Sequence, residues 1–226
     1  MYFIPSHGEN SSLANTTLIY NHGNYAGVEH YQPRLHMLYE LGFNVLVWDF
    51  RGYGKSLPAS HPTVEQFLAD AKTIRDKADE YAPDLDKIVV YSFSLGGIPA
   101  VEMAEHKSAC ALILESSFTS ISHIISTNSA LGMPGSFLSR GRYESHLKLR
   151  DYPGPVFAMV GSIDRKFTPE TIQEVIDNAP GYSELWVLDG IDHGIGTGGV
   201  PEAGFSEYGS KLSEFLENHA LDCLAP

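Results

Sequence analysis

The stretch Ile88-Val-Val-Tyr-Ser-Phe-Ser94-Leu-Gly-Gly97 decides the fold, because a continuous apolar run passes directly into a helical pattern. The run predicts a strand over Lys87–Phe93 that is buried on both faces, as strands of a parallel sheet are. The residues after it predict a helix over Leu95–His106. Ser94 therefore lies at a strand-to-helix turn, where a strained backbone can expose a serine hydroxyl at the end of a sheet.

The residues on either side of Ser94 are small, as such a turn requires. The usual pattern G-x-S-x-G reads Ser92-x-Ser94-x-Gly96 in this chain, so serine replaces the first glycine. For this string alone, an ordinary loop serine and a nucleophile are equally good interpretations. A serine hydroxyl needs an adjacent base, itself oriented by an acid, before it can attack a substrate. The rest of the chain has to supply both.

Outward from this stretch, short β-rich runs alternate with longer helical patterns. This alternation predicts one α/β domain over residues 1–226, with a mostly parallel central sheet flanked by helices. The expected strands are Thr17–Tyr20, Phe43–Phe50, Lys87–Phe93, Cys110–Glu115, Val156–Gly161 and Glu184–Leu188. The expected helices are His30–Leu41, Val64–Tyr81, Leu95–His106, Pro169–Asn178 and Ser206–His219, with Thr63 and Thr168 as N-caps.

Two further turns follow expected strands and carry the base and the acid. His193 lies in the turn after the strand Glu184–Leu188, and Asp164 lies in the turn after Val156–Gly161. Open parallel sheets bind their ligands at the carboxyl ends of the strands. Ser94, Asp164 and His193 are therefore the predicted nucleophile, acid and base.

Acyl transfer also needs backbone N–H donors for the negatively charged oxygen of its intermediate. The amide of Leu95, next to the nucleophile, is the first predicted donor of this oxyanion hole. The second is expected from the loop His22-Gly-Asn24-Tyr25, where glycine lets the backbone come close. Asn24 is the predicted donor and Tyr25 the alternative, whereas His22, His123 and Asp192 are expected to be ordinary hydrogen-bonded loop residues.

Four spaced segments resemble the α/β hydrolases of the serine-esterase and lipase-like group, and also serine aminopeptidase-type hydrolases. They are His22-Gly-Asn24, Asp49-Phe-Arg-Gly-Tyr-Gly-Lys-Ser56, the stretch around Ser94, and Leu114-Glu-Ser-Ser-Phe-Thr-Ser120. The chain order Ser, Asp, His is also that of α/β hydrolases. The resemblance implies that fold, a nucleophile elbow at Ser94, and a structural role for Asp49 and Arg51 in bracing the oxyanion loop. In similar proteins one more strand, and sometimes a membrane anchor, precedes the segment matched by Tyr2-Phe-Ile-Pro5.

Residues 117–151 interrupt the alternation and are too long for an ordinary connection, which predicts a short cap over the site. Tyr25 and Phe118 are the predicted substrate contacts. Apolar residues of this segment fit an acyl pocket and a small core of the cap equally well: Phe118, Ile121, Met133 and Phe137.

Charge and motifs exclude several function classes. Fifteen basic and twenty-eight acidic residues give a net charge of −13, which repels phosphate backbones, so no nucleic-acid partner is expected. Gly54-Lys-Ser56 lacks the earlier glycine that a P-loop needs, and Gly194-Ile-Gly-Thr-Gly-Gly199 is followed at once by Pro201 rather than by a dinucleotide-binding helix. H-E-x-x-H and clustered Cys/His spacings are absent, so neither a metal nor a cofactor is expected.

Cysteines and the beginning of the chain bear on the compartment. Cys110 is expected to be a buried structural thiol, Cys223 lies far from it in the sequence, and nothing indicates a disulfide scaffold. The first ten residues contain no basic leader, and no apolar run approaches membrane-spanning length. These features predict a cytoplasmic protein without a membrane span.

Together these residues predict a serine hydrolase that cleaves carboxylic esters through an acyl-enzyme intermediate. The short cap predicts an open site for small or short-acyl esters. A thioesterase, a lipase or a serine aminopeptidase would use the same machinery, and the sequence leaves these open. An aminopeptidase needs acidic groups for the free amine of its substrate, for which Glu144 and Asp151 are the candidates. A non-catalytic binding module is the alternative from a different class, and the oligomeric state stays open.

Overall fold

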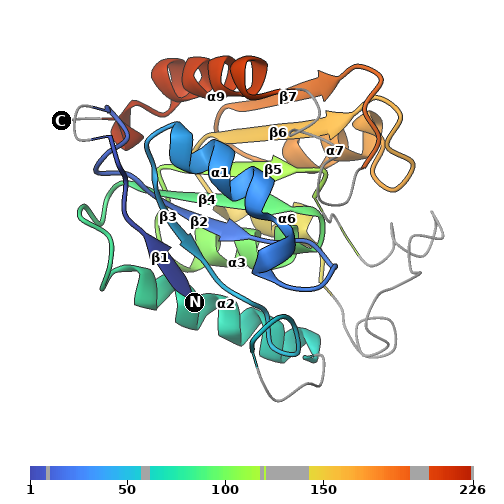
Figure 1. Ribbon diagram of the computed structural model, residues 1–226. Coiled ribbons are helices and arrows are strands. Elements are labelled where there is room, and N and C mark those ends of the chain that lie inside the picture. The colour runs from blue at the N-terminus through green and yellow to red at the C-terminus, as the bar shows by residue number, and fades with distance from the viewer. Residues whose placement is uncertain (9–10, 57–61, 118–119, 121–142, 194–203, 225–226) are drawn as a thin grey trace.

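A mostly parallel sheet forms the centre of the molecule (Figure 1). The computed structural model describes residues 1–8, 11–56, 62–117, 120, 143–193 and 204–224. Among these residues seven strands form one sheet: β1 (Tyr2–Ile4), β2 (Thr17–Asn21), β3 (Asn44–Val47), β4 (Ile88–Phe93), β5 (Ala111–Glu115), β6 (Val156–Gly161) and β7 (Ser183–Leu188). The order across the sheet is β1-β3-β2-β4-β5-β6-β7, and every neighbouring pair is parallel except β1 and β3. The predicted α/β architecture is confirmed.

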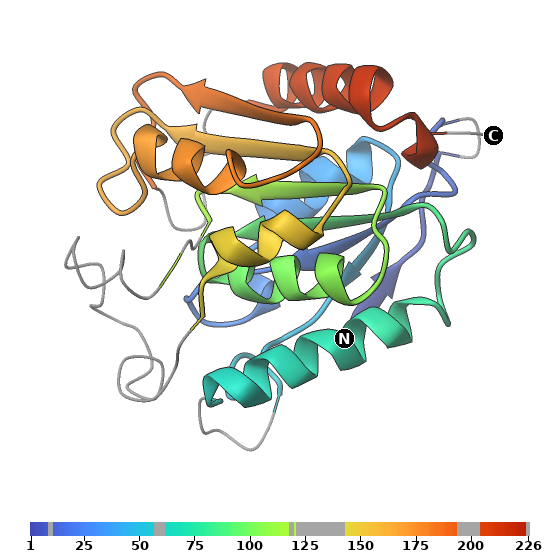
Figure 2. The ribbon, with the colours of Figure 1, turned by 180° about the vertical axis from the view of Figure 1, so that it is seen from behind.

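Helices cover both faces of the sheet, which Figures 1 and 2 show from opposite sides. One face carries α1 (Gln32–Glu40) and α9 (Phe205–His219). The other carries α2 (Val64–Ala78), α3 (Gly97–His106), α6 (Ser145–Lys148) and α7 (Pro169–Ile176). Short 3-10 helices are η1 (Val28–His30), η2 (Ser94–Gly96), η3 (Leu149–Asp151) and η4 (Leu221–Cys223).

Strand β4 shows why its sequence is almost continuously apolar. Val90 belongs to the core under α2 and α3, whereas Tyr91 and Phe93 belong to the core under α1 and α9. All three side chains are almost fully buried. A strand covered on both faces has no solvent side, so the alternation of polar and apolar residues disappears.

Several predicted boundaries are confirmed and others move by a few residues. Thr63 and Thr168 are N-caps, as predicted, and their hydroxyls accept hydrogen bonds from amides three residues later. β3 ends at Val47, earlier than expected, because the Asp49 side chain accepts a hydrogen bond from the amide of Lys55 and folds the chain into a turn. Strand β1 was not among the expected strands, since three residues are too few to show a pattern.

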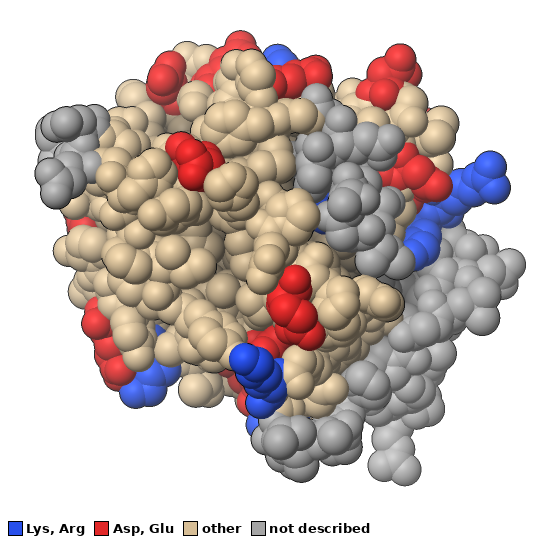
Figure 3. Space-filling view, viewed as in Figure 1, with Lys and Arg blue, Asp and Glu red and all other residues tan. Residues whose placement is uncertain are grey.

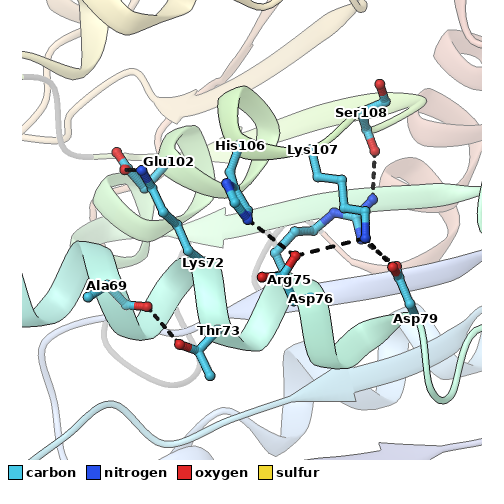
Figure 4. A network of polar contacts seen from close by, with 10 residues as sticks. All are labelled: Ala69, Lys72, Thr73, Arg75, Asp76, Asp79, Glu102, His106, Lys107 and Ser108. Carbon is cyan, nitrogen blue, oxygen red and sulfur yellow. Dashed lines mark hydrogen bonds and ion pairs between the residues drawn. The ribbon is translucent and has the colours of Figure 1, made fainter.

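A network of ion pairs holds α2 against α3, the helix that follows the turn at the predicted nucleophile (Figure 4). The Lys72 ammonium lies 3.0 Å from the carboxylate of Glu102, a residue that is 2 % exposed. Glu102 also pairs with Lys148 of α6. At the other end of the interface, the buried Arg75 guanidinium donates to the carbonyl of Ser108 at 2.7 Å. These contacts fix α3 from two neighbouring helices.

The two cysteines are joined, so the prediction of a structural thiol at Cys110 is wrong. Cys110 and Cys223 form a disulfide whose Cα atoms are 5.4 Å apart. Cys110 precedes β5, while η4 brings Cys223 to the same end of the sheet, where the Thr16 hydroxyl donates to the Cys223 carbonyl at 2.5 Å. A separation of 113 residues hides this proximity in the sequence. Disulfides persist mainly in oxidising compartments. The bond therefore does not support the predicted cytoplasmic location, which stays a prediction.

The predicted cap, residues 117–151, falls largely outside the described residues, which within it are 117, 120 and 143–151. Two of these described positions, Ser120 and Glu144, form an isolated antiparallel bridge. Ile121, His123, Met133 and Phe137 lie outside the described residues. The cap therefore stays a prediction.

Two surface properties concern the whole described part of the chain. Figure 3 shows acidic side chains in separate groups on the face that carries α1, among a larger area of uncharged residues. None of the described helices is long and apolar enough to cross a membrane.

Candidate active site

Ser94 has the backbone conformation of a strained turn. Its φ angle is 52°, in the left-handed region that residues other than glycine rarely adopt. The turn also packs tightly on the end of β2, because a Cβ atom at Gly96 would lie 2.1 Å from the carbonyl oxygen of Asn21. Only glycine fits at this position, and the sharp strand-to-helix turn of the predicted nucleophile elbow results.

Ser92, the departure from the usual motif, is accommodated without disturbing this turn. Its hydroxyl lies 2.6 Å from that of Ser117 and 3.3 Å from the carbonyl oxygen of Ile113. Both partners belong to β5 or the residues directly after it. The side chain at this position is therefore hydrogen-bonded to the neighbouring strand, and a glycine is not required.

The three residues predicted as nucleophile, base and acid lie in one hydrogen-bonded row. His193 Nε2 lies 3.1 Å from Ser94 Oγ, and His193 Nδ1 lies 2.8 Å from Asp164 Oδ2. Because an ionised carboxylate can only accept, the proton of the neutral imidazole is on Nδ1. Nε2 is then the acceptor for the Ser94 hydroxyl, as a general base requires.

Asp164 is held as a carboxylate. Its side chain has no solvent exposure, and Oδ1 accepts hydrogen bonds from the amides of Lys166 at 2.8 Å and Phe167 at 3.1 Å. Burial by itself raises the pKa of Asp164, but the hydrogen bond and charge of His193, together with these amides, bring the pKa below its ordinary value. The acid therefore stays ionised at neutral pH and fixes the orientation of His193.

The turns after β6 and β7 are joined to each other, which places Asp164 beside His193. A Cβ atom at Gly161 would lie 2.1 Å from the carbonyl oxygen of Ile191, so the second turn lies directly on the first. The amide of Ile163 donates to that same carbonyl at 3.1 Å. Glycine at this position thus lets the histidine turn reach across the end of β6.

The predicted oxyanion loop lies against the residue before the nucleophile. A Cβ atom at Gly23 would lie 2.9 Å from Phe93 Cδ1, so the loop backbone touches this ring. The Tyr53 hydroxyl donates to the side-chain oxygen of Asn24 at 2.5 Å and holds the loop from above. The amide of Tyr25, the predicted alternative donor, already donates to the Tyr31 hydroxyl at 3.2 Å.

Asp49 has the bracing contacts that the resemblance implied. Its carboxylate accepts hydrogen bonds from the amides of Val28 at 2.8 Å and Lys55 at 3.0 Å, and so ties the segment after the oxyanion loop to the turn after β3. Arg51 points elsewhere and forms an ion pair of 2.6 Å with Asp70 on α2. The two side chains thus fasten the turn after β3 in two directions.

His22 is the buried residue at the base of the oxyanion loop. Its ring stacks on Phe50 with centroids 3.8 Å apart, Nδ1 lies 2.7 Å from the Gly23 carbonyl, and Nε2 accepts from the Phe50 amide at 3.4 Å. Burial lowers the pKa of His22 to about 4. The neutral ring therefore serves the backbone, as expected for a loop histidine.

The two predicted substrate contacts have different outcomes. Tyr25 is 51 % exposed and its ring meets that of His30 edge-on at 5.1 Å, so it is accessible beside the oxyanion loop. Phe118 lies outside the described residues.

Two aromatic residues that the sequence reasoning missed contact the base. The ring of Phe93 stacks on His193 with centroids 5.2 Å apart, and the ring of Phe167 lies 5.4 Å away at a tilted angle. Phe93 could have been found from its place directly before Ser94, and Phe167 from its place three residues after Asp164. Among the described residues, no cluster of three or more histidine, cysteine or acidic side chains could hold a metal ion.

Comparison with known families shows to which protein family the chain belongs. The family model described as serine aminopeptidase, S33, matches residues 14–152, which is more than half of the sequence. The chain belongs to this family of α/β hydrolases. The match includes Ser94 and ends before Asp164 and His193, so these two residues are supported by geometry alone.

Curated relatives of this S33 family member are longer proteins. The protein bem46 of Schizosaccharomyces pombe is 36 % identical over 134 residues, which is 58 % of this chain and 44 % of the relative. The uncharacterized protein YfhR of Escherichia coli K12 is 28 % identical over 54 % of this chain and 44 % of its own length. The chain spans about half the length of the curated relatives that it matches.

Solved structures confirm the α/β-hydrolase fold. An esterase from Pyrococcus furiosus superposes with a TM-score of 0.73 at 23 % identity, covering 91 % of this chain and 83 % of that chain. Est1E from Butyrivibrio proteoclasticus, solved with ferulic acid bound, also has a TM-score of 0.73, at 18 % identity and with 96 % and 94 % coverage. At these identities the similarity shows the fold.

Proposed function

We propose that this chain hydrolyses carboxylic esters by serine catalysis, with Ser94 as nucleophile, His193 as general base and Asp164 as the acid that orients it. The observation that carries the proposal is the hydrogen-bonded row of the three side chains, which ends at a serine with a positive φ angle. These residues come from three separate turns and meet with the tautomer that a general base requires. The esterases among the similar folds support the same reaction class.

In the acylation step, Ser94 Oγ attacks the ester carbonyl while its proton moves to His193 Nε2. The imidazolium that forms is stabilised by the Asp164 carboxylate, which accepts from Nδ1 at 2.8 Å. The negative charge moves to the carbonyl oxygen, for which the amides of Leu95 and Asn24 are the proposed donors. His193 then gives the proton to the departing alkoxide, which leaves as an alcohol, and the acyl group stays on Ser94.

Deacylation repeats these roles with water. His193 Nε2 takes a proton from a water molecule, the hydroxide attacks the acyl carbonyl, and the proton returns to Ser94 Oγ as the carboxylic acid leaves. The proposed preference for small or short-acyl esters rests on the predicted short cap. Faster turnover of long-chain than of short-chain esters would contradict that preference.

The test measures hydrolysis of p-nitrophenyl esters from acetate to palmitate by the wild type and by Ser94→Ala. Loss of the nucleophile is expected to lower kcat by about four orders of magnitude or more. Ser92→Ala is the matched control, because its hydroxyl is bonded to β5 and away from the row. Activity that survives Ser94→Ala would refute the assignment, and a wild type inactive on every ester would favour a peptide substrate or a binding module.

A serine aminopeptidase activity is the second candidate, because the matching family model carries that description. Such an enzyme needs a carboxylate for the free amine of its substrate. Glu144, one of the two predicted candidates, stands at the base of the predicted cap, with its carboxylate 3.6 Å from His146 and with 35 % of its side chain exposed. Hydrolysis of amino-acid p-nitroanilides that is lost in Glu144→Gln, while ester hydrolysis persists, would support this candidate.

A further inference from the structure

His193 needs more than its two hydrogen bonds to stay in place. The bonds to Asp164 and Ser94 lie at the two nitrogen atoms and leave the ring free to tilt about the line that joins them. Packing against the faces of the ring has to prevent this tilt. Phe93 stacks on the imidazole with an angle of 27° between the ring planes, and Phe167 packs at 41°.

Phe93 is the better placed of these two rings, because it lies next to the nucleophile, the base and the oxyanion loop. It is the residue before Ser94, it stacks on His193, and its Cδ1 atom allows no side chain at Gly23 of the oxyanion loop. Only 2 % of its surface is exposed. A movement of this ring would therefore displace the nucleophile, the base and the oxyanion loop together.

A buried cation contacts the Phe93 ring. The Cζ atom of Arg34, on α1, lies 3.9 Å from the ring centroid, which is the geometry of a cation–π contact. Arg34 is itself fixed by Glu115 at the end of β5, with Nε 3.0 Å and 3.1 Å from the two carboxylate oxygens and Nη2 2.8 Å from Oε1. The Tyr91 hydroxyl donates to the same carboxylate at 2.8 Å. Each end of the ion pair is thus held by several bonds.

Stability alone is a weak reason for such a pair. Arg34 and Glu115 are each 2 % exposed, and removing two charges from water carries a desolvation penalty that apolar residues of similar size avoid. What the pair adds is direction, because a planar guanidinium with several fixed bonds can lie in one orientation only. That orientation is against the ring on which His193 rests.

We infer that Arg34 and Phe93 are positioning residues for the base: Arg34, fixed by Glu115, holds the Phe93 ring, and the ring holds the His193 imidazole in reach of both Ser94 and Asp164. The inference rests on the proposed function, since it assigns His193 as the base. Neither residue touches the substrate in this scheme. Their loss should therefore lower kcat and leave KM nearly unchanged.

The first experiment compares Phe93→Leu with Phe215→Leu. The control removes a buried ring of α9 that stacks on Phe157 of β6 and lies outside the proposed site. Phe93→Leu is expected to lower kcat on p-nitrophenyl acetate about tenfold or more, because small misplacements of a catalytic group are costly. Phe215→Leu should keep the kcat of the wild type. Urea unfolding of both variants confirms that each is folded.

A second readout is independent of turnover. The proton on His193 Nδ1, bonded to Asp164, should give a protected low-field NMR resonance in the wild type and in Phe215→Leu, and it should broaden or vanish in Phe93→Leu. A wild-type kcat or an unchanged resonance in Phe93→Leu would overturn the inference. If the wild type hydrolyses no ester, the proposed function fails, and the resonance still decides whether Phe93 positions the imidazole.

A double-variant cycle tests the part played by Arg34. Arg34→Lys keeps the charge and loses the planar fork, so it should lower kcat. Arg75→Lys, which changes a buried arginine of α2 that pairs with Asp79 at the end of the same helix, should not. If Arg34 acts through the ring, Arg34→Lys with Phe93→Leu should be no slower than Phe93→Leu alone. Losses that multiply would overturn the route through Phe93.

Discussion

Acid should destabilise this protein through His22, whose neutral ring holds the oxyanion loop. The ring stacks on Phe50 and uses both nitrogen atoms, with Nδ1 toward the Gly23 carbonyl and Nε2 accepting from the Phe50 amide. A second proton on Nε2 would remove the acceptor and place a charge in a site without solvent exposure. Burial accordingly lowers the pKa of His22 from 6.5 to about 4.

The sign and size of the effect follow from this difference. The unfolded chain binds the proton near pH 6.5, whereas the folded chain resists it until about pH 4. The contribution of His22 to stability is therefore complete above pH 6.5 and is lost as the pH falls to 4. Over this window the expected loss is about 3 kcal/mol of unfolding free energy.

Urea unfolding of the wild type and of His22→Asn at several pH values between 8 and 4 measures the loss. The variant is less stable at pH 8, and the gap between the two proteins should close by about 3 kcal/mol toward pH 4, because only the wild type has to resist the proton. His36→Asn is the control, since His36 is an exposed histidine of α1 with 71 % of its side chain accessible. A gap that stays constant within about 0.5 kcal/mol from pH 8 to pH 4 would refute the reasoning.

Three substitutions test other parts of the structure. Asp164→Asn should lower kcat on p-nitrophenyl acetate about 10⁴-fold, because an amide donor would favour the His193 tautomer whose Nε2 cannot accept; a KM effect alone would contradict this. Gly96→Ala should destabilise the protein by about 2 kcal/mol in urea and lower kcat, because its Cβ meets the Asn21 carbonyl at 2.1 Å; wild-type values would show that the turn can yield. Cys110→Ser should lower the unfolding free energy by up to about 5 kcal/mol with kcat retained, because the disulfide closes a loop of 113 residues away from the site; equal stability in the presence and absence of reductant would argue against the bond.

The sequence predicts the sheet and the three reacting residues for a shared physical reason. Strands that are buried on both faces have continuous apolar sequences. The residues that follow such strands lie at the same edge of a parallel sheet. Ser94 and Asp164 each follow a run of this kind, and His193 follows the partly exposed strand β7, so position along the chain translates into position in space. Chain order and the ends of the strands therefore predict that these three residues meet, and the structure places them within hydrogen-bond distances of 3.1 Å and 2.8 Å.

Contacts between side chains of different layers carry no such signal. Arg34 and Glu115 are 81 residues apart, and neither has a pattern around it that names the other. The same holds for Cys110 and Cys223, which meet because a short 3-10 helix after α9 returns the chain to the start of β5. Pairings of this kind follow from the packing of helices on the sheet, which local patterns do not specify.

The distance that the histidine turn has to cover explains why glycine is needed far from the nucleophile. β7 lies three places from β4 in the sheet, so the turn after β7 has to bring His193 across the ends of β6 and β5 to reach Ser94. The turn gains reach because the Ile191 carbonyl lies where a Cβ atom of Gly161 would stand, directly on the end of β6. Asp164, three residues after the same glycine, then lies within hydrogen-bond distance of His193. Gly161 thus allows the turn that carries His193 to lie close to the turn that carries Asp164. This close approach helps the three side chains to form one row although β4 is not a neighbour of β6 or β7.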